Sequence, residues 1–216
     1  ALQSQGVTVQ VAQADLRDAA ALGALVAALE RPLKGVVHCA VVTDAAQLGE
    51  LPPLERALEV MAPKVEGAWN LHRATEEAPL DFFLLYSSSV SLVPTRGLPD
   101  YVAGNAFLDA LAAYRQARGL PALSISWGAW SDVGTVAASA QLQRLERGGL
   151  RSFTPARALE LLSLALAGGA PHLGVFDADW PLLLRGHPPA QLAGYFRPVA
   201  KAALAAAGLP VRPLPA

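Results

Sequence analysis

The sequence has few of the features that indicate a secreted, membrane-bound or nucleic-acid-binding protein. Its one cysteine, Cys39, excludes a disulfide framework and fits a reducing compartment, so we expect a cytoplasmic protein. A formal net charge of −1 offers no basic surface to nucleic acid or anionic lipid. No signal peptide is visible, and the apolar runs are too short or too interrupted to cross a bilayer. Four scattered histidines with one cysteine predict no metal site.

Two kinds of hydrophobic segment alternate along the chain. Short β-rich runs and longer segments with helical spacing follow one another, which is typical of an α/β protein whose parallel sheet is doubly wound, with helices on both faces. Strands are predicted at residues 7–12, 35–42, 82–86, 122–127 and 172–176. Helices are predicted at 20–29, at 54–74 with a kink at Pro63, at 101–118, and at 155–167 after the N-cap Thr154.

A glycine-rich turn is missing from this pattern. A dinucleotide-binding sheet opens with a strand, a G-x-G-x-x-G turn and a helix whose N-terminus holds the pyrophosphate. Gly148-Gly149 and Gly168-Gly169 do not lie between a strand and a helix in that arrangement. If the sheet binds a dinucleotide, we expect two strands and the turn to lie upstream of Ala1. The Pro- and Ala-rich residues 186–216 predict a linker or tail.

Four polar residues fall where a doubly wound sheet places its chemistry, beyond the carboxyl ends of the strands. Tyr101 and Asn105 are spaced i, i+4 and share one helix face, while Ser88 ends a predicted strand and Lys64 lies on the preceding helix. Reduction of a ketone by hydride needs a proton donor, and a tyrosine whose pKa is lowered by an ammonium group suits that task. A serine hydroxyl can hold the same oxygen, and an amide can order a relay water. The neighbouring serines at 87, 89 and 91 are interpreted as structural.

A family resemblance becomes specific at these residues. The chain resembles the ketoreductase domains of modular polyketide synthases, of the short-chain dehydrogenase/reductase superfamily, in VMAPKVEGAWNLH and LLYSSSVSLVPTRGLPDYVAGNAFLDALAAYRQARGLPALSISWGAW. Most of that superfamily place a lysine four residues after the tyrosine. These ketoreductases exchange the two positions, as here, where Lys64 precedes Tyr101 and Asn105 follows it. The resemblance covers roughly residues 1–185.

The resemblance implies a Rossmann-like fold, lacking its first two strands, that reduces the β-keto group of an acyl-carrier-protein-bound intermediate with NADPH. Other domains of a polyketide synthase module would be its further partners. It implies four catalytic residues, Lys64, Ser88, Tyr101 and Asn105. It also implies cofactor contacts at Asp15 and Leu16 beside the adenine, at His38, Cys39 and Ala40 under the cofactor, and at Trp127 and Gly128 beside the nicotinamide. A substrate lid is implied at about 137–150.

Departures from the family pattern leave alternatives open. Val41 stands where the family has glycine, and neither family marker of hydroxyl configuration is intact at 42–45 or at Val93. A reductively silent, scaffolding ketoreductase-like domain is therefore the main alternative. A serine hydrolase is disfavoured because Tyr86-Ser87-Ser88-Ser89 is no nucleophile elbow. A free-standing epimerase or dehydrogenase is disfavoured by Asn105. Asp15 can equally cap a turn.

Overall fold

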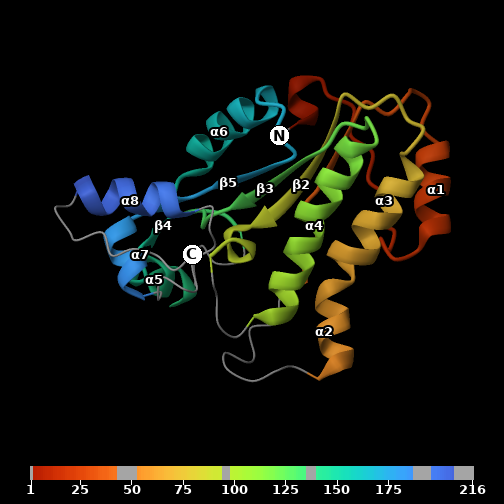
Figure 1. The fold of residues 1–216 in the computed structure, drawn as a ribbon. Coiled ribbons are helices and arrows are strands. Elements are labelled where there is room, and N and C mark those ends of the chain that lie inside the picture. Colours follow the sequence, from red (N-terminus) through yellow and green to blue (C-terminus); the bar gives the residue numbers. More distant parts are fainter. Residues whose placement is uncertain (1, 43–52, 94–97, 135–139, 187–195, 207–216) are drawn as a thin grey trace.

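The fold is built on one parallel sheet. The structure is a computed structural model that describes residues 2–42, 53–93, 98–134, 140–186 and 196–206. The sheet consists of β1 (Gly35–His38), β2 (Phe82–Ser88), β3 (Leu123–Trp127) and β5 (His172–Val175), in the order β1-β2-β3-β5 and all parallel (Figure 1). A separate antiparallel pair joins β4 (Leu150–Arg151) to β6 (Asp177–Ala178). The predicted doubly wound α/β fold is confirmed.

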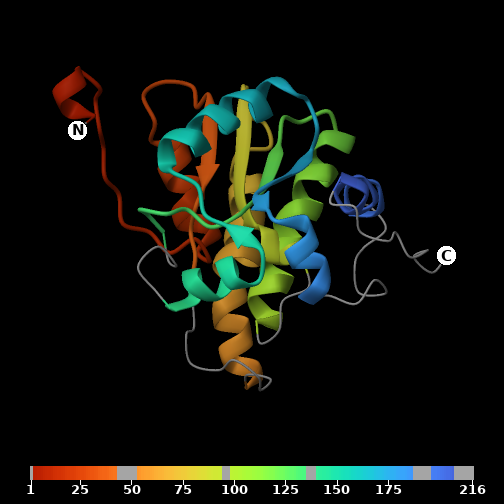
Figure 2. The same cartoon turned by 90° about the vertical axis from the view of Figure 1, so that its left-hand side faces the viewer.

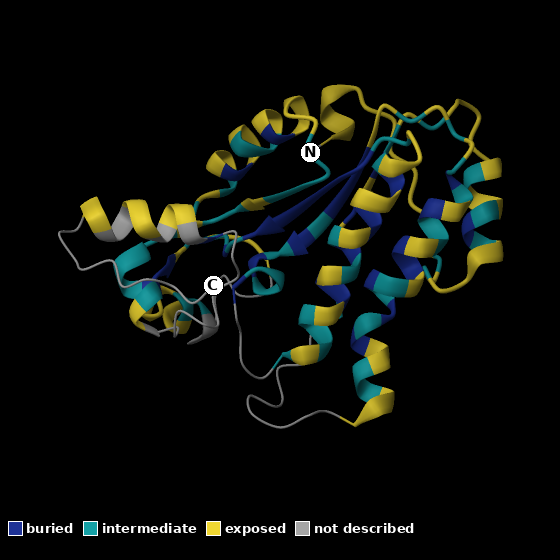
Figure 3. Cartoon of the chain, viewed as in Figure 1, coloured by how far each residue is buried: buried dark blue, intermediate teal, exposed yellow. Residues whose placement is uncertain are grey.

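Helices cover both faces of the sheet, so its central strands, β2 and β3, are largely buried on both sides (Figures 1 and 3). Helices α1 (Ala19–Ala27), α3 (Ala68–Ala74) and α4 (Pro99–Ala117) lie on one face, and α6 (Pro155–Ala167) lies on the other. Phe83 and Leu85 of β2 pack toward α3 and α4, whereas Leu84 packs with the α6 side. This two-sided burial accounts for the nearly continuous apolar runs of the strands.

The predicted helix 54–74 is interrupted at Pro63, as expected. Helix α2 (Leu54–Met61) leads into a π-helical turn, Pro63–Gly67, and then into α3. The Gly67 N–H donates to the Ala62 carbonyl at 2.9 Å, five residues back, which makes this turn wider than an α-helical one. Proline has no N–H to continue the regular ladder. The wide turn places Lys64 at the carboxyl edge of the sheet.

The predicted strand at 7–12 is wrong. The segment is extended but pairs with no strand in the described chain, and Val11 is 92% exposed. Figure 2 shows the N-terminal segment standing apart from the sheet. A strand forms only where a neighbour accepts its backbone hydrogen bonds, and the described sheet ends at β1. The strand predicted at 35–42 likewise ends at His38, because pairing with β2 stops there.

Three helices were not predicted. They are α5 (Ala140–Arg147), α7 (Trp180–Gly186) and α8 (Arg197–Ala206). Helix α5 falls in the predicted lid, of which residues 137–139 lie outside the described chain, and α8 falls in the predicted tail, of which 187–195 and 207–216 lie outside it. Within the described ranges, no helix has the length and hydropathy needed to cross a bilayer.

An arginine is completely buried between α3 and α4. The Arg115 guanidinium lies 4.0 Å from the Phe83 ring centre, and its Nε donates to the Pro121 carbonyl at 3.1 Å. Its Nη1 is 2.9 Å from Nδ1 of His72, which is also fully buried. Because arginine only donates, His72 must accept through Nδ1 and remain neutral. Burial, followed by the Arg115 charge, lowers the pKa of His72.

We expect this buried pair to make the fold sensitive to acid. The unfolded chain takes up a proton at His72 near pH 6.5, whereas the folded chain resists it, so the free energy of unfolding falls as pH drops through 6.5. His72→Asn keeps an acceptor for Arg115 but does not titrate, so its unfolding should depend less on pH. Urea unfolding between neutral and acidic pH compares the two. If the free energy of unfolding depended on pH equally in the unaltered chain and in His72→Asn, a group other than His72 would cause the sensitivity to acid.

Candidate active site

Four residues predicted from separate segments converge at the carboxyl edge of the sheet. Lys64 Nζ lies 5.7 Å from the ring centre of Tyr101 and donates to the Tyr86 carbonyl at 3.1 Å. The Tyr101 phenol lies near enough to the Ser88 side chain, at the end of β2, for that side chain to oppose the rise of the Tyr101 pKa. Asn105, one turn further along α4, donates through Nδ2 to the Tyr101 carbonyl at 2.7 Å. The π-turn, β2 and α4 thus bring the four side chains to one place.

Lys64 is held and desolvated by the elements around it. Its side chain is buried, at 3% exposure, and a Cβ at Gly104 would lie 3.4 Å from the Lys64 Cβ, so α4 packs directly on the lysine. His38, at the end of β1, contacts the Pro63 carbonyl through Nε2 at 2.9 Å, which fixes the turn that carries Lys64. Burial lowers the pKa of Lys64 to about 8, against the opposing influence of Cys39 and Asp109.

The expected lowering of the Tyr101 pKa is not found. Burial raises the pKa of Tyr101 above its usual 10, and the interactions with Ser88 and Asn105 oppose this rise without cancelling it. Asn105 Oδ1 is buried without a hydrogen-bond partner in the described chain, so its approach to the phenol is looser than a normal hydrogen bond. At neutral pH Tyr101 keeps its proton, as a proton donor must.

The pair predicted to meet an adenine has contacts of its own. Arg17 donates to Asp15 from its backbone N–H at 2.9 Å and from its guanidinium, and both residues are exposed. These bonds lower the pKa of Asp15 to about 2 and cap a turn, which is the alternative that the sequence left open. Leu16 packs so closely on Gly67 that a Cβ there would lie 2.8 Å from the Leu16 Cβ. The adenine contact stays a prediction.

The segment after β1 divides into buried and open residues. His38 is buried under the Lys64 turn, whereas Cys39 and Val41 are exposed and Ala40 is half-buried. Although Cys39 is exposed as a residue, partial burial of its thiol raises its pKa. Cys39 and Val41 therefore offer open surface beside Lys64, on which a flat ligand could lie.

Within the described chain, Trp127 and Gly128 are packed against other residues and do not face an open cleft. Trp127 is buried among Tyr86, Trp130 and Phe153 on the α6 side of the sheet, with ring centres 5.3–6.2 Å from its own. A Cβ at Gly128 would lie 2.7 Å from the Phe176 Cβ, so glycine is required here by packing. Their predicted place beside a nicotinamide remains untested.

Two polar residues near the site were missed from the sequence. Asp109 accepts hydrogen bonds from Ser91 and Ser124, and Asn70 Nδ2 donates to the Leu16 carbonyl at 2.9 Å. A signal for Asp109 was available, because Tyr101, Asn105 and Asp109 repeat every four residues on a helix otherwise rich in alanine and leucine. No comparable pattern marks Asn70.

His172 does not turn this cluster into a hydrolytic triad. The same atom, His172 Nε2, lies 2.9 Å from Ser126 Oγ and 3.4 Å from Asp109 Oδ1. A serine-histidine-aspartate relay instead uses the two ring nitrogens for the two partners. The geometry disfavours the hydrolase alternative.

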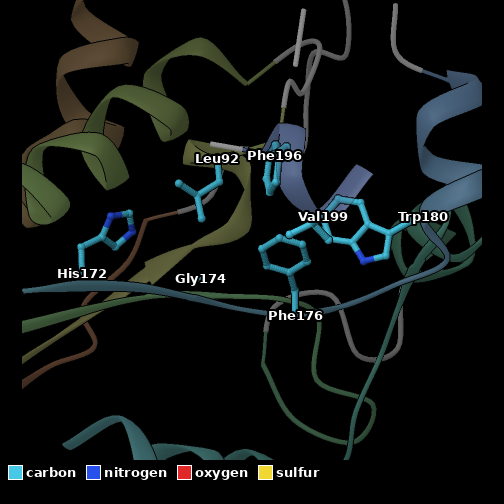
Figure 4. A pocket seen from close by; sticks show the side chains of 7 residues that line it. All are labelled: Leu92, His172, Gly174, Phe176, Trp180, Phe196 and Val199. Atoms are coloured by element: carbon cyan, nitrogen blue, oxygen red, sulfur yellow. The ribbon is translucent and has the colours of Figure 1, made fainter. Parts of the chain in front are cut away.

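A pocket of about 410 Å³ lies away from Lys64, Ser88, Tyr101 and Asn105. Its walls come from β5, α7, α8 and Leu92, and none of the four converging side chains lines it (Figure 4). Phe176, Trp180 and Phe196 form a mutually packed aromatic wall, with His172 at the opposite end in Figure 4.

Comparison with known proteins places the chain in a family. The model of the KR domain matches residues 1–132, well over half of the sequence. The chain belongs to the KR domain family of polyketide synthases. The polyketide synthase GfsB of Streptomyces halstedii is 44% identical over 177 residues, which are 80% of this chain and 3% of that protein. Pks1 of Mycobacterium tuberculosis, whose name carries the word inactive, is 44% identical over 172 residues, 77% of this chain and 11% of that protein.

Solved ketoreductases share the fold of this KR chain. A structure described as an A1-type ketoreductase superposes with a TM-score of 0.86 at 32% identity, covering 94% of this chain and 43% of that one. The first ketoreductase of the tylosin polyketide synthase superposes with a TM-score of 0.78 at 36% identity, covering 94% and 44%. The chain therefore spans less than half of the solved ketoreductases it matches.

Proposed function

We propose that this KR chain supplies the proton-donating half of an NADPH-dependent reductase that converts a β-ketoacyl group on an acyl carrier protein to a β-hydroxyacyl group. The observation that carries the proposal is the convergence of Lys64, Ser88, Tyr101 and Asn105. Other domains of a polyketide synthase module would be its partners, since the curated relatives are polyketide synthases of which it spans a small part.

Each side chain has a distinct task in the proposal. The Ser88 hydroxyl, near the phenol at the end of β2, holds the ketone oxygen beside it. Tyr101 transfers its proton to that oxygen as negative charge develops there. Lys64 uses one N–H on the Tyr86 carbonyl and retains two for the phenolate or for a ribose hydroxyl. Asn105 Oδ1, buried and without a partner in the described residues, can accept a hydrogen bond from a relay water.

The residues present fit the nicotinamide end of the cofactor. NADPH would supply the hydride to the β-carbon. Cys39 and Val41 leave open surface beside the buried Lys64 ammonium group, which suits a flat ring and its ribose. The glycine-rich turn that holds a pyrophosphate does not occur within the 216 residues, so the chain can hold only part of the nucleotide.

The proposal is tested by incubating the natural polypeptide that carries these residues with NADPH and a β-ketoacyl thioester. We expect oxidation of the nucleotide to match formation of the β-hydroxyacyl thioester, identified by mass spectrometry. Use of NADH at equal efficiency would refute the preference for NADPH but not the proposed reduction. Binding of NADPH without ketone reduction would refute the reductase.

A silent domain is the second candidate. Val41 favours it, because a side chain replaces the family's glycine beside the site, and so does the raised pKa of Tyr101, which makes the phenol a weaker acid. The complete set of four polar side chains favours catalysis, since a scaffold has no need of a buried lysine. The same assay separates the two.

We expect turnover to fall as pH rises through about 8. Lys64 carries its charge below that pH and loses it above, whereas the pKa of Tyr101 is raised above 10 and leaves the phenol protonated. Lys64→Arg keeps a cation and should flatten the alkaline decline, while Lys34→Arg, at an exposed site, should not. A pH profile of kcat compares the folded variants. If kcat of Lys64→Arg fell with rising pH as it does in the unaltered protein, a group other than Lys64 would cause the fall.

A further inference from the structure

A carboxylate with no part in the proposed chemistry lies one helical turn beyond Asn105. Asp109 Oδ1 accepts from Ser124 Oγ at 2.6 Å, and Oδ2 accepts from Ser91 Oγ at 2.8 Å. His172 Nε2 is 3.4 Å from Oδ1. The Asp109 side chain is only 12% exposed, so α4, β3, β5 and the 3₁₀ turn Ser89–Ser91 meet on one largely buried anion.

A group of serine hydroxyls lies between this carboxylate and two residues of the site. Ser91 Oγ lies 3.0 Å from the Ser88 carbonyl. Ser126 Oγ lies 3.1 Å from Ser91 Oγ and 3.4 Å from Ser87 Oγ, which donates to the Asn105 carbonyl at 3.3 Å. Three serine hydroxyls therefore lie between the Ser88 and Asn105 carbonyls, and two of them, Ser91 and Ser126, also lie within hydrogen-bond distance of Asp109.

The Asp109 carboxylate is needed to fix the direction in which the Ser91 hydroxyl donates its one proton. Ser91 has three neighbours within hydrogen-bond distance but only one proton to donate. An ionised carboxylate is the strongest acceptor among them and orients the hydroxyl by a charge-assisted bond. An amide at position 109 could turn an N–H toward Ser91 and reverse that orientation.

Asp109 also acts on Lys64 through its charge. Its negative charge raises the pKa of Lys64, opposing the lowering by burial. The groups that face Lys64 from the surrounding elements are His38 at the end of β1, Cys39 directly after it, the Tyr86 carbonyl of β2, and Tyr101 and Asp109 of α4.

We propose that Asp109 is a positioning residue: by accepting from Ser91 it holds the turn Ser89–Ser91, and with it Ser88 at the end of β2, against the helix α4 that carries Tyr101 and Asn105. The inference rests on the proposed ketone reduction, because the geometry it maintains is that of the Ser88–Tyr101 pair. Since misplacement of reacting groups by about 1 Å can cost 10²-fold in rate, a network of this kind is expected to affect turnover more than binding.

Three variants in the natural polypeptide test the proposal, with Asp81→Asn at an exposed site as the matched control for charge. Asp109→Asn should lose roughly ten- to hundredfold in kcat with little change in KM for the ketone. The fall of kcat at alkaline pH should begin at a lower pH in this variant, because Lys64 loses the neighbouring negative charge. Ser91→Ala should lose kcat without that change in pH dependence. Ser124→Ala removes a bond to the same carboxylate but no link to Ser88, so its loss should be smaller.

A readout besides activity keeps the two proposals apart. Competitive acylation of Lys64 across pH, followed by mass spectrometry, should show its midpoint at lower pH in Asp109→Asn than in Asp81→Asn. If the unaltered polypeptide reduces no ketone, the proposed function fails while this shift still tests the effect of Asp109. Equal kcat losses in Ser91→Ala and Ser124→Ala, or wild-type kcat in Asp109→Asn, would overturn the positioning role. If Asp109→Asn does not fold, the two serine variants decide.

Discussion

Tyr101→Phe is expected to reduce ketone turnover by roughly 10²–10⁴-fold while leaving nucleotide affinity nearly unchanged. The phenol donates its proton only as charge develops on the ketone oxygen, so its loss affects the transition state rather than the ground state. The ring itself stays, and with it the packing of Tyr101 over the Lys64 ammonium group. Steady-state kinetics and a nucleotide titration in the natural polypeptide measure the two effects separately.

Tyr114→Phe provides the matched control on the same helix. Tyr114 is exposed, and its hydroxyl only accepts a hydrogen bond from Arg118. Its loss should leave kcat within about twofold, as is usual for surface substitutions away from special features. A Tyr101→Phe variant that retained more than about a tenth of the turnover would remove Tyr101 as the acid.

Arg115→Ala is expected to lower the free energy of unfolding by about 3–5 kcal/mol. The substitution empties the space beside the Phe83 ring and leaves the Pro121 carbonyl and His72 Nδ1 without their donor. Arg115 is completely buried, and this burial lowers the pKa of its guanidinium to about 10. Urea unfolding monitored by circular dichroism measures the change.

Arg118→Ala, three residues later on the same chain, gives the comparison. Arg118 is exposed and pairs with Glu76, so its removal should cost less than about 1 kcal/mol. Comparable losses in the two variants would mean that the buried contacts of Arg115 contribute no more than a surface ion pair.

The layers of the fold could be predicted from the sequence because buried parallel strands and amphipathic helices leave strong patterns. Helix α4 was predicted within two residues of each end, and the Thr154 cap of α6 is confirmed by its hydrogen bond to the Arg157 N–H. The prediction of a strand at 7–12 was wrong because a β-rich composition forms a strand only where a neighbouring strand is present to pair with it. Helix α8 was missed because alanine dominates its sequence, and α7 was missed because its seven residues are too few for a helical repeat to show.

The convergence of the four side chains of the candidate site could be predicted from the sequence, but their electrostatic environment could not. The spacing of Tyr101 and Asn105 fixed their shared face, and family resemblance supplied Lys64 and Ser88. The direction of the Tyr101 pKa depended on how deeply α4 buries the phenol, which the sequence does not state. Asp109 escaped notice because its partners, Ser91, Ser124 and His172, come from three separate elements.

Transfer of a labelled hydride tests the central claim most directly. The natural polypeptide would be incubated with NADPH deuterated at the transferable C4 position and a β-ketoacyl thioester, and the product examined by mass spectrometry. The account predicts one deuterium on the β-carbon of a β-hydroxyacyl thioester, and its loss in Tyr101→Phe. A polypeptide that binds the nucleotide but yields no deuterated alcohol would contradict it, and would identify this KR chain as a scaffold.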